Sequence, residues 1–127
     1  MSKNILVVDD SYYMRTILKH MLEDAGYHVI DEAANGQDAL KGVDTNREKL
    51  DLVTLDLILP DNSGLDVLKE IKAKHPDLKV MVVSAVGQQT IVDQALAIGA
   101  NAYVIKPFEE SKVMEIVDEL MKEEDAK

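Results

Sequence analysis

The chain contains no cysteine, no tryptophan and a single phenylalanine among its 127 residues. Disulfide bonds and thiolate metal sites are therefore excluded, and a reducing compartment is compatible with the composition. Only three prolines and six glycines are present, and no apolar run approaches the length of a membrane span. The start, from Met1 to Asn4, leads directly into an apolar run that is too short for a signal peptide, so we expect a cytoplasmic protein.

Basic residues are also scarce, since 14 lysines and arginines stand against 24 aspartates and glutamates and the net charge is −10. Nucleic acid phosphates would repel such a chain, so we expect no nucleic acid partner. Since no apolar run is long enough to span a membrane, we expect no membrane partner either. Much of the acidic excess is interpreted as surface charge that favours solubility. The length and the 46% hydrophobic content suit one domain, covering residues 1–127, and we expect a monomer.

Four short apolar runs each end abruptly at a polar residue. Continuous apolar runs of this length are typical of strands that are buried on both faces, as in parallel sheets covered by helices. The runs are residues 5–8 before Asp9 and Asp10, 52–55 before Asp56, 80–83 before Ser84, and 102–105 before Lys106.

Between these runs, apolar residues recur at helical spacing, and a weaker strand is expected at residues 28–34. The predicted helices cover residues 14–25, 37–43, 65–71, 91–98 and 113–121, with Gly26 and Gly99 as natural stops. A strand followed by a helix thus occurs five times. The pattern predicts an α/β fold: a doubly wound five-stranded parallel sheet, flavodoxin-like (βα)5, with strand order 2-1-3-4-5.

Ligands of such sheets bind outside the carboxyl ends of the strands, where Asp9, Asp10, Asp56, Ser84 and Lys106 would meet. Two carboxylates about 4 Å apart repel by roughly 4 kcal/mol at an effective dielectric near 20, and a cation or a proton relieves this repulsion. Neutralising Asp10 or Asp56 is therefore expected to stabilise the metal-free protein. Oxygen ligands favour Mg²⁺, Mn²⁺ or Ca²⁺, and Mg²⁺ commonly also binds a phosphate. The lysine and the hydroxyl would contact the anion.

Each of these residues also has an ordinary structural explanation. Asp9 and Asp10 could cap the following helix, and Lys106 could be a solvated lysine at a strand end. Their coincidence at matching strand ends favours a shared site. The three histidines lack metal-ligand spacing, and we expect them at the surface or at helix ends: His20, His28 and His75.

The chain resembles the receiver domain of two-component response regulators over essentially its whole length. An ordered set of motifs carries the resemblance: Asp9-Asp10 with Ser11 and Arg15, Asp56 followed by Pro60 and Gly64, Ser84-Ala85, and Lys106-Pro107-Phe108. The length and the stretch of residues 84–89 are most similar to single-domain chemotaxis regulators of the CheY type.

The resemblance implies a chemical role for each matching acidic residue. Asp56 would accept the phosphoryl group. Asp10, Asp56 and the backbone carbonyl of Ile58 would bind Mg²⁺, and Asp9 would act on the metal through a water molecule. The charge of Asp56 and of the phosphate must be neutralised before a carboxylate can attack phosphorus, which agrees with these roles.

The resemblance also implies a switch. Lys106 would pair with the phosphoryl group, Ser84 would donate a hydrogen bond to it, and Tyr103 would change rotamer in response. The implied protein is a signalling switch rather than an enzyme: it takes a phosphoryl group from a histidine kinase and catalyses only its own phosphorylation and dephosphorylation. A downstream protein would bind the face made by the fourth helix, the last strand and the fifth helix, near Ile91, Ala95, Tyr103 and Lys112.

Three alternatives are kept open. An Mg²⁺-dependent phosphatase would have a second acid two residues after the nucleophile, where this chain has Ile58. A flavin carrier would have a hydroxyl- or glycine-rich phosphate loop in place of Asp9-Asp10. The chain could also be a receiver from a longer regulator.

Ile58 and Val86 replace polar residues of the chemotaxis prototype that help place the hydrolytic water, so we expect slow self-dephosphorylation.

Overall fold

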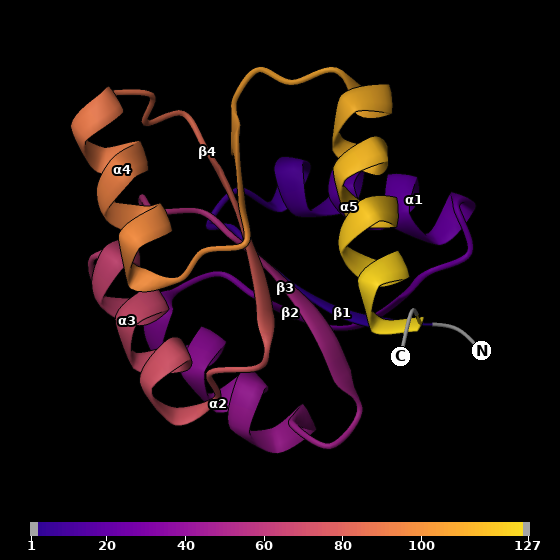
Figure 1. Cartoon of the computed structure of the whole chain (residues 1–127), viewed down its shortest axis with the longest axis horizontal. Coiled ribbons are helices and arrows are strands. Elements are labelled where there is room, and N and C mark those ends of the chain that lie inside the picture. Colours follow the sequence, from indigo (N-terminus) through magenta and orange to yellow (C-terminus); the bar gives the residue numbers. More distant parts are fainter. Residues whose placement is uncertain (1–2, 126–127) are drawn as a thin grey trace.

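One parallel sheet of five strands lies between two layers of helices (Figure 1). The computed structural model describes residues 3–125. The strand order is β2-β1-β3-β4-β5 and each neighbouring pair is parallel, which confirms the predicted flavodoxin-like topology. The strands are β1 (Asn4–Val8), β2 (His28–Ala33), β3 (Leu50–Leu55), β4 (Lys79–Ser84) and β5 (Ala102–Ile105).

The helices divide between the two faces of the sheet. Helices α1 and α5 cover one face, and α2, α3 and α4 cover the other, on the left and lower side of Figure 1. No helix within residues 3–125 has the length and apolar character required to cross a bilayer. The helices are α1 (Tyr12–Asp24), α2 (Gly36–Asn46), α3 (Gly64–Lys74), α4 (Gln89–Ile98) and α5 (Glu110–Asp125).

The central strands are apolar throughout because both of their faces are covered. In β1, Ile5 and Val7 pack in the hydrophobic cluster beneath α1 and α5, whereas Leu6 and Val8 pack in the cluster beneath α2, α3 and α4. Successive side chains of a strand point to opposite faces, so one unbroken apolar run supplies both clusters.

Helix ends follow local sequence signals. The Ser11 hydroxyl accepts a hydrogen bond from the Met14 amide at the start of α1, and the Asn35 side chain accepts one from Asp38 at the start of α2. Such side chains satisfy amides that lack a partner within the helix. Gly26 and Gly99 follow α1 and α4 with φ of 97° and 128°, a backbone conformation that favours glycine.

Boundaries differ from the predicted ones where the apolar pattern is weak. Strand β2 ends at Ala33, one residue before the predicted end, and Asp31 and Glu32 within it are not fully buried because β2 is an edge strand. Helix α2 extends to Asn46, three residues past the expected end, where the Asn46 side-chain amide donates to the Gly42 carbonyl. Ser84 is the last residue of β4 rather than the first residue after it.

Candidate functional site at the carboxyl edge of the sheet

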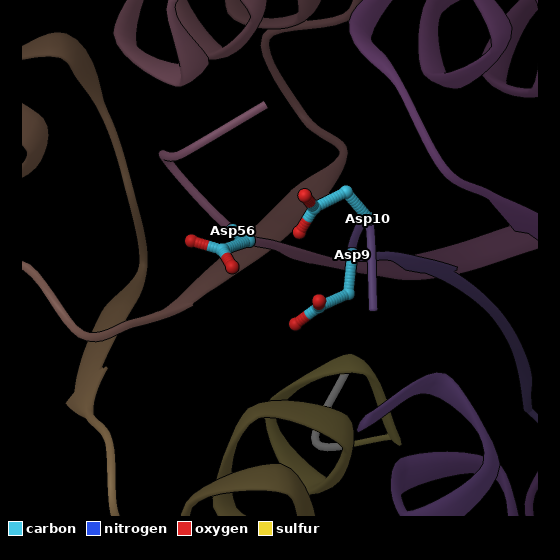
Figure 2. A group of neighbouring side chains, drawn as sticks. All are labelled: Asp9, Asp10 and Asp56. Atoms are coloured by element: carbon cyan, nitrogen blue, oxygen red, sulfur yellow. The ribbon is translucent and has the colours of Figure 1, made fainter. Parts of the chain in front are cut away.

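Three carboxylates gather where β1 and β3 end. Val8 and Leu55 are register partners, and the Asp56 amide donates to the Val8 carbonyl at 3.0 Å, so Asp9 and Asp56 leave the sheet side by side. One oxygen from each of Asp9, Asp10 and Asp56 lies within 4.8 Å of the others, and Figure 2 shows the three side chains gathered in one region. Asp9 and Asp56 are buried and Asp10 is exposed. The predicted convergence of the three aspartates is therefore confirmed.

Lys106 bridges two of these carboxylates. Its Nζ lies 2.6 Å from Asp9 Oδ2 and 2.9 Å from Asp56 Oδ2, and its side chain is 16% exposed. Burial alone would lower the pKa of Lys106, but the hydrogen bonds and negative charges of Asp9 and Asp56 outweigh burial and raise it above 10.5. The site therefore contains a fixed positive charge at neutral pH.

The remaining oxygens of the two buried carboxylates accept backbone hydrogen bonds. Asp56 Oδ1 accepts from the Ile58 amide at 3.0 Å, and Asp9 Oδ1 accepts from the Ser11 amide at 2.9 Å. These bonds hold both carboxylates in fixed orientations. Among residues 3–125, no hydrogen bond or ion pair involves the Asp10 carboxylate, so both of its oxygens are available to a ligand.

The donor set fits a hard divalent cation such as Mg²⁺. The three aspartates supply only oxygen ligands, and Asp10 faces solvent, from which a hydrated ion would arrive. Mg²⁺ commonly uses one or two carboxylates and retains several waters, so the site does not need a closed cage of protein ligands. One lysine offsets only part of three negative charges in close proximity, and the remaining charge favours a cation.

Ser84 lies at the end of β4, two strands from Asp9 in the sheet. Its side chain is fully buried, and its Oγ accepts a hydrogen bond from the Val86 amide at 3.3 Å. The Lys106 amide donates to the Ser84 carbonyl at 2.8 Å, so the two predicted anion-binding residues belong to adjacent strand ends. The hydroxyl contacts its own loop in this structure, and no hydrogen bond joins it to the aspartates among the described residues.

Tyr103 reaches the same loop from β5. Its hydroxyl donates to the Val86 carbonyl, and its ring packs against the cluster beneath α2, α3 and α4. Burial, together with the negative charge of Asp56, raises the pKa of Tyr103 above 10, so its hydroxyl remains a donor at neutral pH. The β4–α4 loop is thus held at Val86 from two sides, by the Ser84 and Tyr103 side chains.

Two contacts near the site were not predicted from the sequence. Arg15 belongs to the first motif, and its Nη1 donates to the Asp9 carbonyl at 2.8 Å while its Nε donates to Glu32. Asp61 accepts hydrogen bonds from the Gly36 and Gln37 amides. These bonds, the one from Gly36 more than the one from Gln37, lower the pKa of Asp61 below 3.8. Only the fold brings Asp61 to α2, because about 25 residues separate the partners.

The histidines lie where the sequence predicts them. His20 and His28 are exposed, and His75 follows the last residue of α3, where its ring contacts Arg47 and Asp44. None of the three belongs to the group of potential metal ligands found among the described residues.

Comparison with known proteins gives a consistent result. The family profile "Response regulator receiver domain" matches residues 5–118. The chain is 42% identical to chemotaxis protein CheY of Thermotoga maritima over 123 residues, covering 96% of this chain and 100% of that protein. It is 41% identical to chemotaxis protein CheY of Listeria monocytogenes over 118 residues, covering 93% and 98% of the two chains.

A solved structure agrees in fold as well as in sequence. The CheX–CheY–BeF3–Mg complex from Borrelia burgdorferi superposes with a TM-score of 0.91 at 30% identity, covering 94% of this chain and 89% of that chain. The match to the family profile spans most of the chain, and the relatives are matched over nearly their full length. The chain therefore belongs to the response regulator receiver domain family and is CheY-like.

Proposed function

We propose that this protein is a phosphorylation-activated switch of a two-component system that accepts a phosphoryl group from a histidine kinase on Asp56 and acts in chemotaxis. The observation that carries the proposal is the position of the Lys106 ammonium between Asp9 and Asp56, beside the exposed Asp10. This arrangement supports the proposal, because a fixed cation lies next to an oriented carboxylate that could act as the nucleophile. The similarity to CheY proteins supports chemotaxis as the pathway.

The transfer requires an Asp56 oxygen to attack phosphorus while the bond from phosphorus to the donor nitrogen breaks and its electron pair returns to that nitrogen. The Ile58 amide orients Asp56 through Oδ1, and Oδ2 faces Lys106. As the phosphoryl group arrives, the lysine can exchange its bond to Asp56 for one to a phosphoryl oxygen while Asp9 keeps it in place. Such positioned charges are the main catalytic contribution in phosphoryl transfer.

Mg²⁺ bound here would neutralise the negative charge of the carboxylates and the phosphoryl group. Asp10 and Asp56 would hold it through carboxylate oxygens, Ile58 through its backbone carbonyl, and Asp9 through a water molecule. The exposed Asp10 carboxylate supports this assignment, because within residues 3–125 it has no hydrogen bond or ion pair to give up when it takes the metal.

The signal would leave the site through Val86. Ser84 would rotate to donate to a phosphoryl oxygen, and Val86 would move because its amide is bonded to the Ser84 hydroxyl. Tyr103 would then lose the carbonyl that its hydroxyl contacts and change rotamer. Each step replaces one hydrogen bond by another, which makes the loop a two-state element.

The surface that would change is the face made by α4, β5 and α5, near Ile91, Tyr103 and Lys112. Ala95, which the sequence also places on this face, is fully buried in the core and is not part of it. Helix α4 buries only Ala95, and its Leu96 is 46% exposed. Ile105 of β5 is 47% exposed beside Gly87. Exposed apolar side chains next to a movable loop suit a protein partner that distinguishes the two states.

Intact-mass measurement after incubation with acetyl phosphate and Mg²⁺ tests the proposal. We expect one phosphoryl adduct on the wild type, none in EDTA, and none on Asp56→Asn. Asp51→Asn, which changes an aspartate at the opposite end of β3, is the matched control and should react like the wild type. An adduct on Asp56→Asn, or full reaction in EDTA, would show that the acceptor or the metal requirement is wrong.

A further inference from the structure

The loop between β3 and α3 is fastened to the start of α2 by one carboxylate. Asp61 Oδ1 accepts a hydrogen bond from the Gly36 amide at 2.7 Å, and Oδ2 accepts one from the Gln37 amide at 3.0 Å. These are the first two amides of α2, which have no partner within the helix. Asn35 caps the same helix separately, through the Asp38 amide at 2.8 Å.

The contact between this loop and α2 is close-packed. A Cβ atom added at Gly36 would lie 2.8 Å from Asn62 Cβ and 3.0 Å from Val67 Cγ2. The first turn of α2 therefore lies directly against the residues that follow Asp61, with no space for a side chain. Asp61 accordingly fixes the tip of the loop at a defined position.

The other end of the same loop touches the acceptor. The Ile58 amide donates to Asp56 Oδ1, Ile58 forms an isolated bridge with Ser63, and the Gly64 amide donates to the Leu57 carbonyl at 2.9 Å. Residues 57–64 thus form a short closed loop with Asp61 at its tip and the backbone of Ile58 at its base. Displacement of the tip is transmitted to the base because little free chain lies between them.

We propose that Asp61 is a positioning residue for the metal and phosphoryl site: by fastening the loop tip to α2, it holds the Ile58 backbone where its amide orients Asp56 and where its carbonyl would bind a metal ion. This inference rests on the proposed function, because it assumes Mg²⁺ as the ligand. Groups that orient metal ligands from outside typically change metal affinity by about 10–100-fold when they are removed. Asp61 acts through a backbone segment, so Asp61→Ala should weaken Mg²⁺ binding by roughly tenfold.

Calorimetric titration of Mg²⁺ into the full chain tests this inference, with urea unfolding of each variant alongside. Asn35→Ala is the matched control, because it removes the other cap of α2 and does not touch the loop. We expect Asp61→Ala and Asn35→Ala to lose comparable stability, and only Asp61→Ala to lose Mg²⁺ affinity. Asp61→Asn keeps one oxygen acceptor, so its affinity should be intermediate, and it replaces Asp61→Ala if the alanine variant does not fold.

The outcomes separate this inference from the function on which it rests. If the wild type binds no Mg²⁺, the proposed metal site is wrong and the inference falls with it. If the wild type binds and all Asp61 variants bind equally well, Asp61 only stabilises α2 and the inference alone is overturned. Equal loss of affinity in Asp61→Ala and Asn35→Ala would likewise assign the effect to helix stability and overturn it.

Discussion

Neutralising Asp10 should make the metal-free protein more stable than the wild type. When Mg²⁺ is present, the same variant should be less stable than the wild type. The Asp10 carboxylate lies within 4.8 Å of both Asp9 and Asp56. Two unit charges at that distance repel by about 3.5 kcal/mol at an effective dielectric of 20 and about 0.9 kcal/mol in water. Asp10 is exposed, so the lower value applies to each pair, and the nearby Lys106 cancels part of the sum.

The net gain for Asp10→Asn in EDTA is therefore about 1 kcal/mol, which raises the melting temperature by about 3–6 °C for a chain of 127 residues. Mg²⁺ at a hundred times its dissociation constant stabilises the wild type by about 2.7 kcal/mol through mass action, and the variant should lose most of that effect. Thermal unfolding in EDTA and in Mg²⁺ should thus reverse the order of the two proteins. A variant that melts below the wild type in EDTA would refute the assumed charge repulsion.

The same substitution at Asp56 should behave differently. Asp56 is buried, pairs with Lys106 at 2.9 Å and accepts from the Ile58 amide, so Asp56→Asn removes repulsion and attraction together. Removing one partner of a buried ion pair is usually costly, although Asp9 still holds the lysine here. We expect Asp56→Asn to be no more stable than the wild type in EDTA. The sequence alone predicts the same gain for both substitutions, and the structure distinguishes them.

Three further expectations follow from contacts in and near the site. Replacing Ile58 and Val86 together by asparagine should speed loss of the phosphoryl group, because polar side chains can hydrogen-bond the attacking water; an unchanged decay rate, measured by intact mass over time, would contradict this. Tyr103→Ala should leave phosphorylation nearly intact while reducing the affinity difference between the two forms for a partner, a coupling typically worth about 1–3 kcal/mol, and an unchanged difference would place the output surface elsewhere. The pKa of Asp61 is lowered, so its contribution to stability is present above pH 3.8 and is lost as the pH falls through the lower folded-state value; Asp61→Asn should therefore flatten the acid limb of the stability profile measured by urea unfolding, and an identical limb would contradict the α2 contact.

The sequence predicts the sheet and the acidic cluster well for one physical reason. Parallel strands end at a common edge, so polar residues that follow apolar runs must meet there, as Asp9 and Asp56 do. The same reasoning places Lys106 near them. The end of α2 is less well predicted, because the polar residues Asp44, Thr45 and Asn46 extend the helix beyond its apolar pattern.

Contacts between loops could not be predicted from the sequence. The bonds from Gly36 and Gln37 to Asp61 join residues that are distant in the chain, and an aspartate after Pro60 reads only as part of a turn. The hydrogen-bond partner of the Ser84 hydroxyl could not be predicted either, because a rotatable side chain at a strand end can face either the crevice or its own loop.

The spacing of Asp9 and Asp56 has a consequence for how such a protein can diverge. Both residues directly follow paired residues of adjacent strands, so the backbone ladder, with its roughly 4.8 Å interval, sets their separation. No helix side chain is needed to set that separation. Mutations on the helix surfaces can therefore accumulate and create new binding specificities while the distance between the charged groups stays constant. The sheet therefore maintains the geometry that the chemistry requires, while the helices are free to acquire different recognition surfaces.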